Sequence, residues 1–333
     1  MRDGTRGEII LPDLVCSSVL EVVLAAGFIA RLADVDTDTY SLTPETIKPH
    51  LSANTRAILV VHMFGHAAPV QAIARLATSS RVWLIEDAAQ GIGGRSESGR
   101  AIGSFGDFAF LSFDASKTIR GKGGLLLYDD DAWAEPIRRA LSPDLPKEDS
   151  PSDQLLQTSL RDLYHGLGQA VRQERLSATQ AARTFREALP VYRSLLFRAF
   201  DDRPENLNQI LGDWHGLPTR IARRNETASS LRDAFANLPV SLPPIKNGDA
   251  IWRYSVRFPS REAADRFVVT LRQRGGLVSQ LYYPLHQLYQ PDLQLKTKCW
   301  APLLVNLWVD EAVGKSYVRL VRETALDTLG TEN

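Results

Sequence analysis

Short apolar runs alternate with amphipathic segments over residues 8–141. Apolar runs of strand length, bounded by Gly, Asp or Ser, predict strands. These strands are EIILP (8–12), 28–35, AILVV (57–61), VWLI (82–85), FAFLSF (108–113) and GGLLLY (123–128). Helical periods or helix start signals predict helices between and after them, over 15–26, 41–51, 69–80 and 131–141. Strands that are apolar on both faces belong in a sheet covered on both sides, and this alternation specifies right-handed parallel crossovers. We therefore predict an α/β fold with a mostly parallel central sheet and helices on both faces.

The pattern changes in the second half of the chain. Residues 142–154 are rich in Pro, Ser and Asp and predict a loop, whereas residues 155–200 predict a long helical stretch that covers the large domain. From residue 216 onward helices and strands alternate, predicted over 219–235, 252–258, 261–275, 277–289 and 310–329. This alternation is typical of an α+β domain. We therefore predict a large domain over 1–215, with a helical insertion at about 150–200, and a small domain over 216–333.

The composition is that of a globular protein with no strong charge preference. The chain has 333 residues, 44% hydrophobic and 23% charged, and its 39 basic and 39 acidic side chains cancel. This balance argues against nucleic acid or an anionic membrane as a partner. Cys16 and Cys299 are far apart in sequence, which favours a reducing, cytoplasmic location. The apolar segment 19–32 is too short to cross a bilayer. His62 and His66 follow a strand without further histidines nearby, so no metal site is predicted.

Polar side chains follow two of the central strands at the point where each strand ends. Glu86 and Asp87 end one strand, and Ser112, Ser116 and Lys117 follow the next. In an open α/β sheet, ligands bind at the carboxyl ends of the strands. An acid and a lysine delivered to neighbouring strand ends therefore indicate a binding site.

Lys117 has two interpretations. Most lysines are solvated surface charges, because Lys is rarely buried without a partner. Here, however, the lysine follows an aromatic strand and precedes a turn with Gly121, Gly123 and Gly124, where the backbone can approach a ligand closely. A lysine in such a place can lose its proton and react with a carbonyl group.

Several motifs occur together in one order along the chain, namely IEDAAQ (85–90), GSFGD (103–107), LSF followed by Lys117, and GKGG (121–124). Together with the segments 10–47 and 55–70, they resemble the DegT/DnrJ/EryC1/StrS family of sugar aminotransferases, which depend on pyridoxal 5'-phosphate (PLP) and have fold type I. The resemblance covers nearly all of residues 8–130, and 200–333 more loosely.

The resemblance implies a role for four residues. Asp87 would face the pyridine nitrogen of PLP and keep it protonated, so that the ring can act as an electron sink. Gln90 would hydrogen-bond the phenolic oxygen of the cofactor, Ser112 would help to hold its phosphate, and Lys117 would bind it covalently and act as the catalytic group. Each of the first three also has a structural alternative: a helix N-cap for Asp87, a solvated helix residue for Gln90, and an ordinary strand-end hydroxyl for Ser112.

The chain departs from the family pattern in three places. Relatives carry an additional N-terminal segment whose Ser-Gly-Thr turn opens a helix and cradles the PLP phosphate, and we expect that segment to be lacking here. Where relatives often have an aromatic that stacks on the ring, this chain has Leu14 and Cys16. Tyr282 replaces the His of a His-Tyr-Pro turn on the substrate side. Part of the cofactor site is therefore expected to be absent.

The resemblance implies an aminotransferase that transfers an amino group, with glutamate as the expected donor, to a nucleotide-linked ketosugar in polysaccharide or sugar-derivative biosynthesis. Relatives build the site at a dimer interface, so a homodimer is implied. An alternative is a truncated, non-catalytic homologue with weakened PLP binding that acts as the partner of a complete paralogue. A PLP-dependent sugar dehydratase is less favoured, because relatives with that chemistry have His at the position of Lys117.

Overall fold

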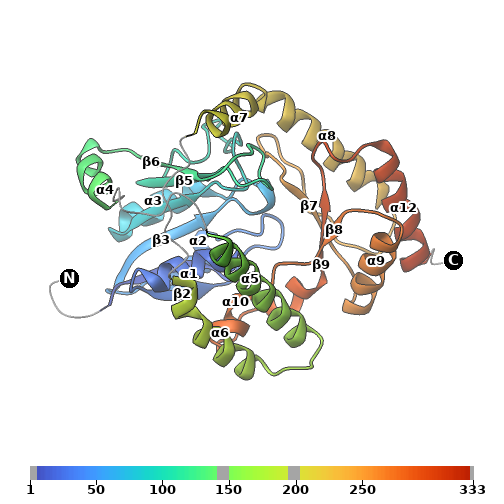
Figure 1. The fold of residues 1–333 in the computed structure, drawn as a ribbon, viewed down its shortest axis with the longest axis horizontal. Coiled ribbons are helices and arrows are strands. Elements are labelled where there is room, and N and C mark those ends of the chain that lie inside the picture. Colours follow the sequence, from blue (N-terminus) through green and yellow to red (C-terminus); the bar gives the residue numbers. More distant parts are fainter. Residues whose placement is uncertain (1–5, 141–149, 194–202, 331–333) are drawn as a thin grey trace.

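The computed structural model describes residues 6–140, 150–193 and 203–330. Its larger sheet has the strand order β2-β1-β3-β4-β5-β6, and the first five of these strands are mutually parallel (Figure 1). Their bounds agree with the predicted runs to within a few residues: β1 Glu8–Pro12, β2 Ile29–Ala33, β3 Thr55–Val61, β4 Trp83–Asp87, β5 Phe108–Ser112 and β6 Gly124–Tyr128. The predicted α/β class with a mostly parallel central sheet is confirmed.

The strand β6 differs from the prediction. Its apolar run was expected in the covered middle of the sheet, but β6 pairs antiparallel with β5 at the sheet edge. Leu125 is 42% exposed, and the whole strand lies near the surface. The physical reason lies in the connection 113–123, which contains no helix, so that the chain turns back instead of making the long crossover that a parallel strand needs.

Helices and short helical turns connect the strands of the larger sheet, and each predicted helix is present, although some are shorter. Thr43 caps one of them with a reciprocal capping box and Pro44 starts it, as its start signal predicts, but that helix then has only four residues. Residues of the strands and helices share one core, in which Ile10, Leu11 and Ile58 are fully buried. The bounds are α1 Ser17–Ala25, α2 Pro44–Ile47, η1 Lys48–His50, η2 Met63–Gly65, α3 Val70–Ser80, η3 Asp131–Trp133 and α4 Ala134–Ala140.

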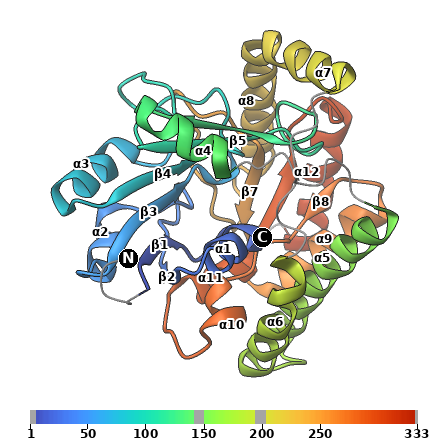
Figure 2. The ribbon, with the colours of Figure 1, turned by 60° about the vertical axis from the view of Figure 1, so that its left-hand side comes forward.

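The predicted helical stretch 155–200 consists of two helices as far as residue 193, and its end lies outside the described residues. The first, α5 (Pro151–Arg172), starts within the predicted loop, because Ser150 caps it and Pro151 occupies its first position. The second is α6 (Ala178–Arg193). The two lie side by side and pack against α1 and against α10 (Leu285–Tyr289), so they cover part of the larger domain as expected (Figures 1 and 2).

A second sheet of three antiparallel strands has the order β7-β9-β8, in which β7 spans Arg253–Arg257, β8 Val278–Ser279 and β9 Leu304–Trp308. The central strand β9 was not predicted, although its sequence LVNLW is a short apolar run. Of the strand and turn predicted over 277–289, the strand is only the two-residue β8, and the short helix α10, which was not predicted, begins directly after Pro284.

Long helices cover the outer side of this second sheet and share a separate core with it (Figure 1). Phe235, Phe258 and Phe267 form an aromatic cluster at its centre. The helices of the C-terminal part are α7 Pro204–His215, α8 Leu217–Ala234, α9 Arg261–Gln273, α11 Thr297–Trp300, η4 Ala301–Leu303 and α12 Lys315–Leu329. Residues from α10 to η4 pack instead into the core of the larger sheet. The domain boundary at residue 215 stays a prediction.

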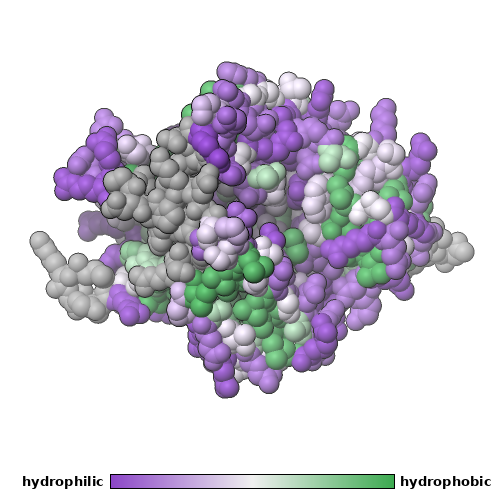
Figure 3. All heavy atoms as spheres, in the orientation of Figure 1, coloured by the Kyte–Doolittle hydropathy of each residue, from purple (hydrophilic) through white to green (hydrophobic). Residues whose placement is uncertain are grey.

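The surface seen in Figure 3 is largely hydrophilic, and apolar side chains gather in the region of α5. Leu155 of that helix is 68% exposed. Within the ranges that the structure describes, no helix combines the length and the apolar character that a membrane span requires.

The loop after β3 joins the two sheets through backbone hydrogen bonds. The amide of Ala250 donates to the carbonyl of Gly65 at 3.0 Å, and the amide of Trp252 donates to the carbonyl of Phe64 at 2.8 Å. Gly65 has a φ of +91°, and a Cβ built there would lie 2.1 Å from the carbonyl oxygen of Ala250. Only glycine permits both this backbone conformation and this contact.

We expect Gly65→Ala to lower the free energy of unfolding by clearly more than Gly99→Ala. Gly99 also has a positive φ, +78°, but a Cβ there has nothing within 4 Å. The control therefore reports only the left-handed conformation, about 1–2 kcal/mol, while Gly65→Ala adds the clash with Ala250. Urea unfolding of both variants measures the difference. Equal decreases in the free energy of unfolding would contradict the proposed role of Gly65 in the close contact between the two sheets.

Candidate active site

A cavity of about 920 Å³ lies between the carboxyl ends of β4 and β5, the second sheet and helix α5. The four residues singled out from the sequence, Asp87, Gln90, Ser112 and Lys117, all line it. Their side chains come from two segments of the chain, 87–90 and 112–117, that the pairing of β4 with β5 places side by side. The structure therefore brings the predicted site residues together in one cavity, which is where ligands bind in open α/β sheets.

Asp87 is the last residue of β4 and is only 5% exposed. Its Oδ1 accepts a hydrogen bond of 2.9 Å from the amide of Ala89. Residues 88–94 form turns without a helix, so the alternative of a helix N-cap is wrong. Burial raises the pKa of Asp87, against the hydrogen bond from Ala89 and the positive charge of Lys117. A carboxylate in this environment is stabilised by a cationic partner in the cavity.

Gln90 is buried as well, so the alternative of a solvated helix residue is also wrong. Its Oε1 accepts a hydrogen bond of 2.9 Å from the amide of Phe64, and its Nε2 donates to the hydroxyl of Tyr282 at 3.0 Å. These two bonds fix the orientation of the amide group. Burial raises the pKa of Tyr282, which therefore keeps its proton. Tyr282 closes this side of the cavity at the position where the sequence motif predicts a His.

Ser112 ends β5, and its hydroxyl makes only a long contact of 3.5 Å with the amide of Asp114. Asp114 in turn accepts hydrogen bonds from the amide and the hydroxyl of Ser116, at 2.9 and 2.7 Å. Burial opposes ionisation of Asp114, but these hydrogen bonds and the charges of Lys117 and Arg161 keep its pKa below the usual value. The turn therefore carries a negative charge, and the Ser112 hydroxyl stays available for a ligand.

Lys117 lies against an aromatic ring of the second sheet. Its Nζ is 4.9 Å from the ring centroid of Trp252, whose Nε1 donates a hydrogen bond of 2.7 Å to the carbonyl of Ser116. Arg253 and Trp308 line the cavity beside them, with the guanidinium 4.4 Å from the centroid of Trp252 and 4.2 Å from that of Trp308. Trp252, which directly precedes β7, thus orients the lysine through a cation–π contact.

The sequence analysis did not predict two groups of residues that line the cavity, one beside the second sheet and one on α5. Trp252 and Arg253 lie in a predicted strand, but only its pairing with the unpredicted β9 places Trp308 beside them. Helix α5 contributes Arg161, Tyr164 and His165. Their spacing of three and four residues on an amphipathic helix was the available signal.

A buried histidine, His62, contacts both the backbone of Asp87 and the side chain of the neighbouring Glu86. The amide of His62 donates to the carbonyl of Asp87 at 3.0 Å, and the amide of Ala68 donates to His62 Nδ1 at 3.2 Å. The proton of a neutral His62 ring therefore lies on Nε2, which is 3.1 Å from Glu86 Oε2. This pair was not singled out from the sequence, where nothing shows that residues 62 and 86 meet.

Glu86 also holds the loop that follows. It accepts hydrogen bonds of 2.5 to 2.7 Å from the amides of Gly103, Phe105 and Gly106. Burial opposes its ionisation, but the bonds from His62 and from this loop keep the pKa of Glu86 below its usual value. Glu86 therefore acts as a buried anion that ties β3, β4 and the GSFGD loop together.

The two histidines after β3 point to different partners. His62 contacts Glu86, whereas His66 Nδ1 lies 3.1 Å from Asp249 Oδ2. Among the described residues, no three His, Cys, Asp or Glu side chains are grouped as a metal site requires.

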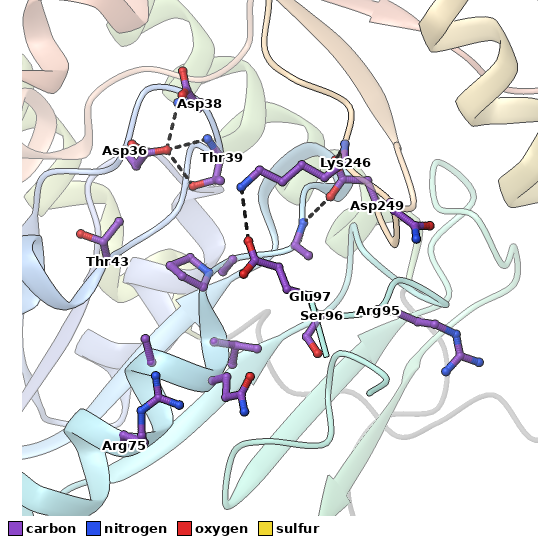
Figure 4. A pocket seen from close by; sticks show the side chains of 17 residues that line it. Asp36, Asp38, Thr39, Thr43, Arg75, Arg95, Ser96, Glu97, Lys246 and Asp249 are labelled. Atoms are coloured by element: carbon purple, nitrogen blue, oxygen red, sulfur yellow. Dashed lines mark hydrogen bonds and ion pairs between the residues drawn. The ribbon is translucent and has the colours of Figure 1, made fainter. Parts of the chain in front are cut away.

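A second cavity, of about 340 Å³, is lined by charged residues, but these are largely satisfied by their neighbours (Figure 4). Asp36 accepts hydrogen bonds from the amide and hydroxyl of Thr39, and Asp249 accepts from two backbone amides. Lys246 lies 3.7 Å from Glu97. The larger cavity holds Lys117 and the other three residues singled out from the sequence, so we regard it as the candidate active site.

The family model of the DegT/DnrJ/EryC1/StrS aminotransferase family matches residues 2–186, more than half of the chain. Together with the fold and the lysine-containing cavity, this match defines the class of protein: the chain belongs to that family.

Individual relatives agree with this assignment. The chain is 27% identical over 325 residues to dTDP-4-dehydro-2,3,6-trideoxy-D-glucose 4-aminotransferase of Saccharopolyspora spinosa, covering 91% of this chain and 74% of that protein. It is 32% identical over 124 residues to GDP-perosamine synthase of Escherichia coli O157:H7, a match that spans 37% of this chain and only 34% of the relative.

Solved structures show the same fold. The aminotransferase TlmJ of Streptoalloteichus hindustanus superposes with a TM-score of 0.76 and 22% identity, covering 98% of this chain and 80% of that one. PseC of Helicobacter pylori, an aminotransferase involved in pseudoaminic acid biosynthesis, gives a TM-score of 0.75 at 17% identity, covering 98% and 81%. The predicted fold type I is thereby confirmed.

We expect Glu86→Gln to lower the free energy of unfolding by about 1–3 kcal/mol at neutral pH, because a neutral amide pairs poorly with three amide donors and His62. The carboxyl has a lower pKa in the folded protein than its usual 4.5. Its stabilisation is therefore present above that value and is lost as the pH falls through the folded-state pKa. The difference between wild type and variant should shrink in acid, as measured by urea unfolding at several pH values.

Glu97→Gln is the matched control, because the Glu97 side chain is 89% exposed. A difference between Glu86→Gln and wild type that does not change with pH would contradict this account.

Proposed function

We propose that this protein is a PLP-dependent aminotransferase that transfers an amino group to a nucleotide-linked ketosugar. The single observation that carries the proposal is the meeting of Asp87 and Lys117 in one buried cavity at the strand ends. Burial raises the pKa of Asp87, so its carboxylate favours a cationic partner such as a protonated pyridine ring. The amine of Lys117 can react with the carbonyl group that such a cofactor carries.

The residues present fit PLP. Asp87 offers a buried carboxylate that lacks an ion pair among the described residues, and Ser112 offers a hydroxyl with only a weak contact. Phe110 and Ile85 of the sheet supply apolar lining. When bound, PLP supplies an electron sink next to the amine-bearing carbon of the substrate.

Each residue then has a defined task. Asp87 would hold the proton on the ring nitrogen, since removal of that proton would leave a carboxylate buried without a counter-charge. Gln90 and Tyr282 would orient the ring through their mutual hydrogen bond, and Ser112 would bind the phosphate. Lys117 Nζ would attach the cofactor and move the proton at the substrate carbon. Trp252 would orient this lysine and restrict water.

The substrate class follows from the relatives rather than from the cavity. Two of them are named for reactions of dTDP- and GDP-linked sugars. We infer a nucleotide sugar as amino acceptor, glutamate as the donor, and a role in polysaccharide or sugar-derivative biosynthesis in the cytoplasm.

We also infer a homodimer with a large domain over 1–215 and a small domain over 216–333. Light scattering tests the dimer against the chain mass of 37.0 kDa.

We expect Lys117→Ala to abolish the covalent attachment of PLP, because no other lysine lines the cavity within the described part of the chain. The measurement is borohydride reduction followed by peptide mass spectrometry. Lys122→Ala is the matched control, since Lys122 is exposed on the same turn and does not line the cavity. Wild-type protein that forms no adduct would refute the proposal and favour the non-catalytic homologue.

We expect Asp87→Asn to lower the rate of amino transfer by about tenfold to a hundredfold, which corresponds to the loss of one charge-assisted hydrogen bond. The assay follows conversion of glutamate to 2-oxoglutarate with a panel of nucleotide ketosugars. Asp129→Asn removes an exposed carboxylate outside the cavity and should leave the rate unchanged. Equal rates for Asp87→Asn and wild type would exclude a role of Asp87 in the chemistry.

A further inference from the structure

One wall of the active-site cavity is built by α5 and has no task in the mechanism above. Arg161, Tyr164 and His165 all line the cavity. Positions three and four residues apart lie on one face of a helix. These three residues therefore line one wall of the same cavity as Ser112 and Lys117.

The polar groups of this wall lack partners. Tyr164 is 7% exposed, and its hydroxyl has no hydrogen bond to any residue that the structure describes; the same holds for the buried Nδ1 of His165. Burial raises the pKa of Tyr164, so the hydroxyl is a proton donor. A buried donor without an acceptor costs about 1–3 kcal/mol. Native proteins rarely leave such groups unsatisfied unless a water or a ligand completes them.

The position of α5 is set by tight packing. A Cβ built on Gly168 would lie 2.2 Å from the ring of Tyr283, so only glycine lets the helix approach so closely. One turn further on, Arg172 pairs with Asp265 and donates a hydrogen bond of 2.6 Å to Gln280. These contacts hold α5 firmly against the segments that carry Asp265, Gln280 and Tyr283.

The charges of the cavity favour an anion at this wall. Two carboxylates, Asp87 and Asp114, face three cations, Lys117, Arg161 and Arg253. Arg253 already pairs with Asp310 at 3.2 Å. Arg161 forms no ion pair with a described residue, and it interacts with Asp114 only at longer range. Of the two arginines that line the cavity, Arg161 is thus the one without an ion pair among the described residues.

We propose that Arg161, Tyr164 and His165 bind a phosphate group of a ligand in the cavity. A guanidinium binds phosphate with two parallel hydrogen bonds, and the Tyr164 hydroxyl adds a third donor. Burial lowers the pKa of His165, and the charge of Arg161 lowers it further, so the neutral ring can also donate one hydrogen bond. The identity of the ligand rests on the proposed function: the phosphate belongs to PLP or to the diphosphate of a nucleotide sugar.

Equilibrium dialysis of the full chain against paired probes distinguishes the two sources. The probes are PLP against pyridoxal, and GDP and dTDP against guanosine and thymidine. We expect Arg161→Gln to weaken binding of one phosphorylated probe by about tenfold or more, and Tyr164→Phe to weaken it less. Binding of the probes without phosphate should not change. Arg161→Lys should restore part of the affinity, because it keeps the charge but not the paired donors.

Arg183→Gln is the matched control, since Arg183 is an exposed arginine on α6 outside the cavity. Loss confined to PLP assigns the wall to the cofactor, and loss confined to the nucleotides assigns it to the substrate. The inference is overturned when Arg161→Gln and Arg183→Gln bind every probe equally, or when wild-type protein binds no phosphorylated probe. Phosphate binding that depends on Arg161 without any amino transfer would support the inference while the proposed function fails.

Discussion

The arrangement of the site depends on a carboxylate held away from water at the end of β4. Burial makes the ionised form of Asp87 costly, and among the described residues its side chain accepts a hydrogen bond only from the Ala89 amide. Its position is maintained from behind, because the His62 amide binds its carbonyl and Glu86 ties the neighbouring loop to β4. A cation delivered into the cavity would relieve the electrostatic cost, so the carboxylate prepares the site for a positively charged ring.

The rest of the cavity comes from segments far apart in the chain. Trp252 directly precedes β7 and Tyr282 follows β8. Both make hydrogen bonds with the segments that follow strands of the first sheet, Trp252 with Ser116 after β5 and Tyr282 with Gln90 after β4. The close contact at Gly65 joins these two parts. Because the site is shared between them, any motion of one sheet against the other changes the distance between Lys117 and its aromatic neighbours.

Membership of the aminotransferase family accounts for the first sheet and its strand-end residues, and the family match also spans α5. The helix brings an arginine, a tyrosine and a histidine to the cavity and is fixed by the contact of Gly168 with Tyr283. The cavity thus combines polar groups at the ends of parallel strands with polar side chains of α5.

The sequence alone determined the parallel strands, the helices between them and the four residues at the strand ends, because apolar periodicity and local motifs extend over few residues. It placed β6 in the wrong environment, missed β9 and did not indicate that His62 meets Glu86. Those features depend on which segments pair across long separations, and pairing is decided by tertiary packing rather than by local propensity. The same holds for Trp308 and for the polar face of α5, whose chemistry becomes visible only when the folded chain closes them around Lys117.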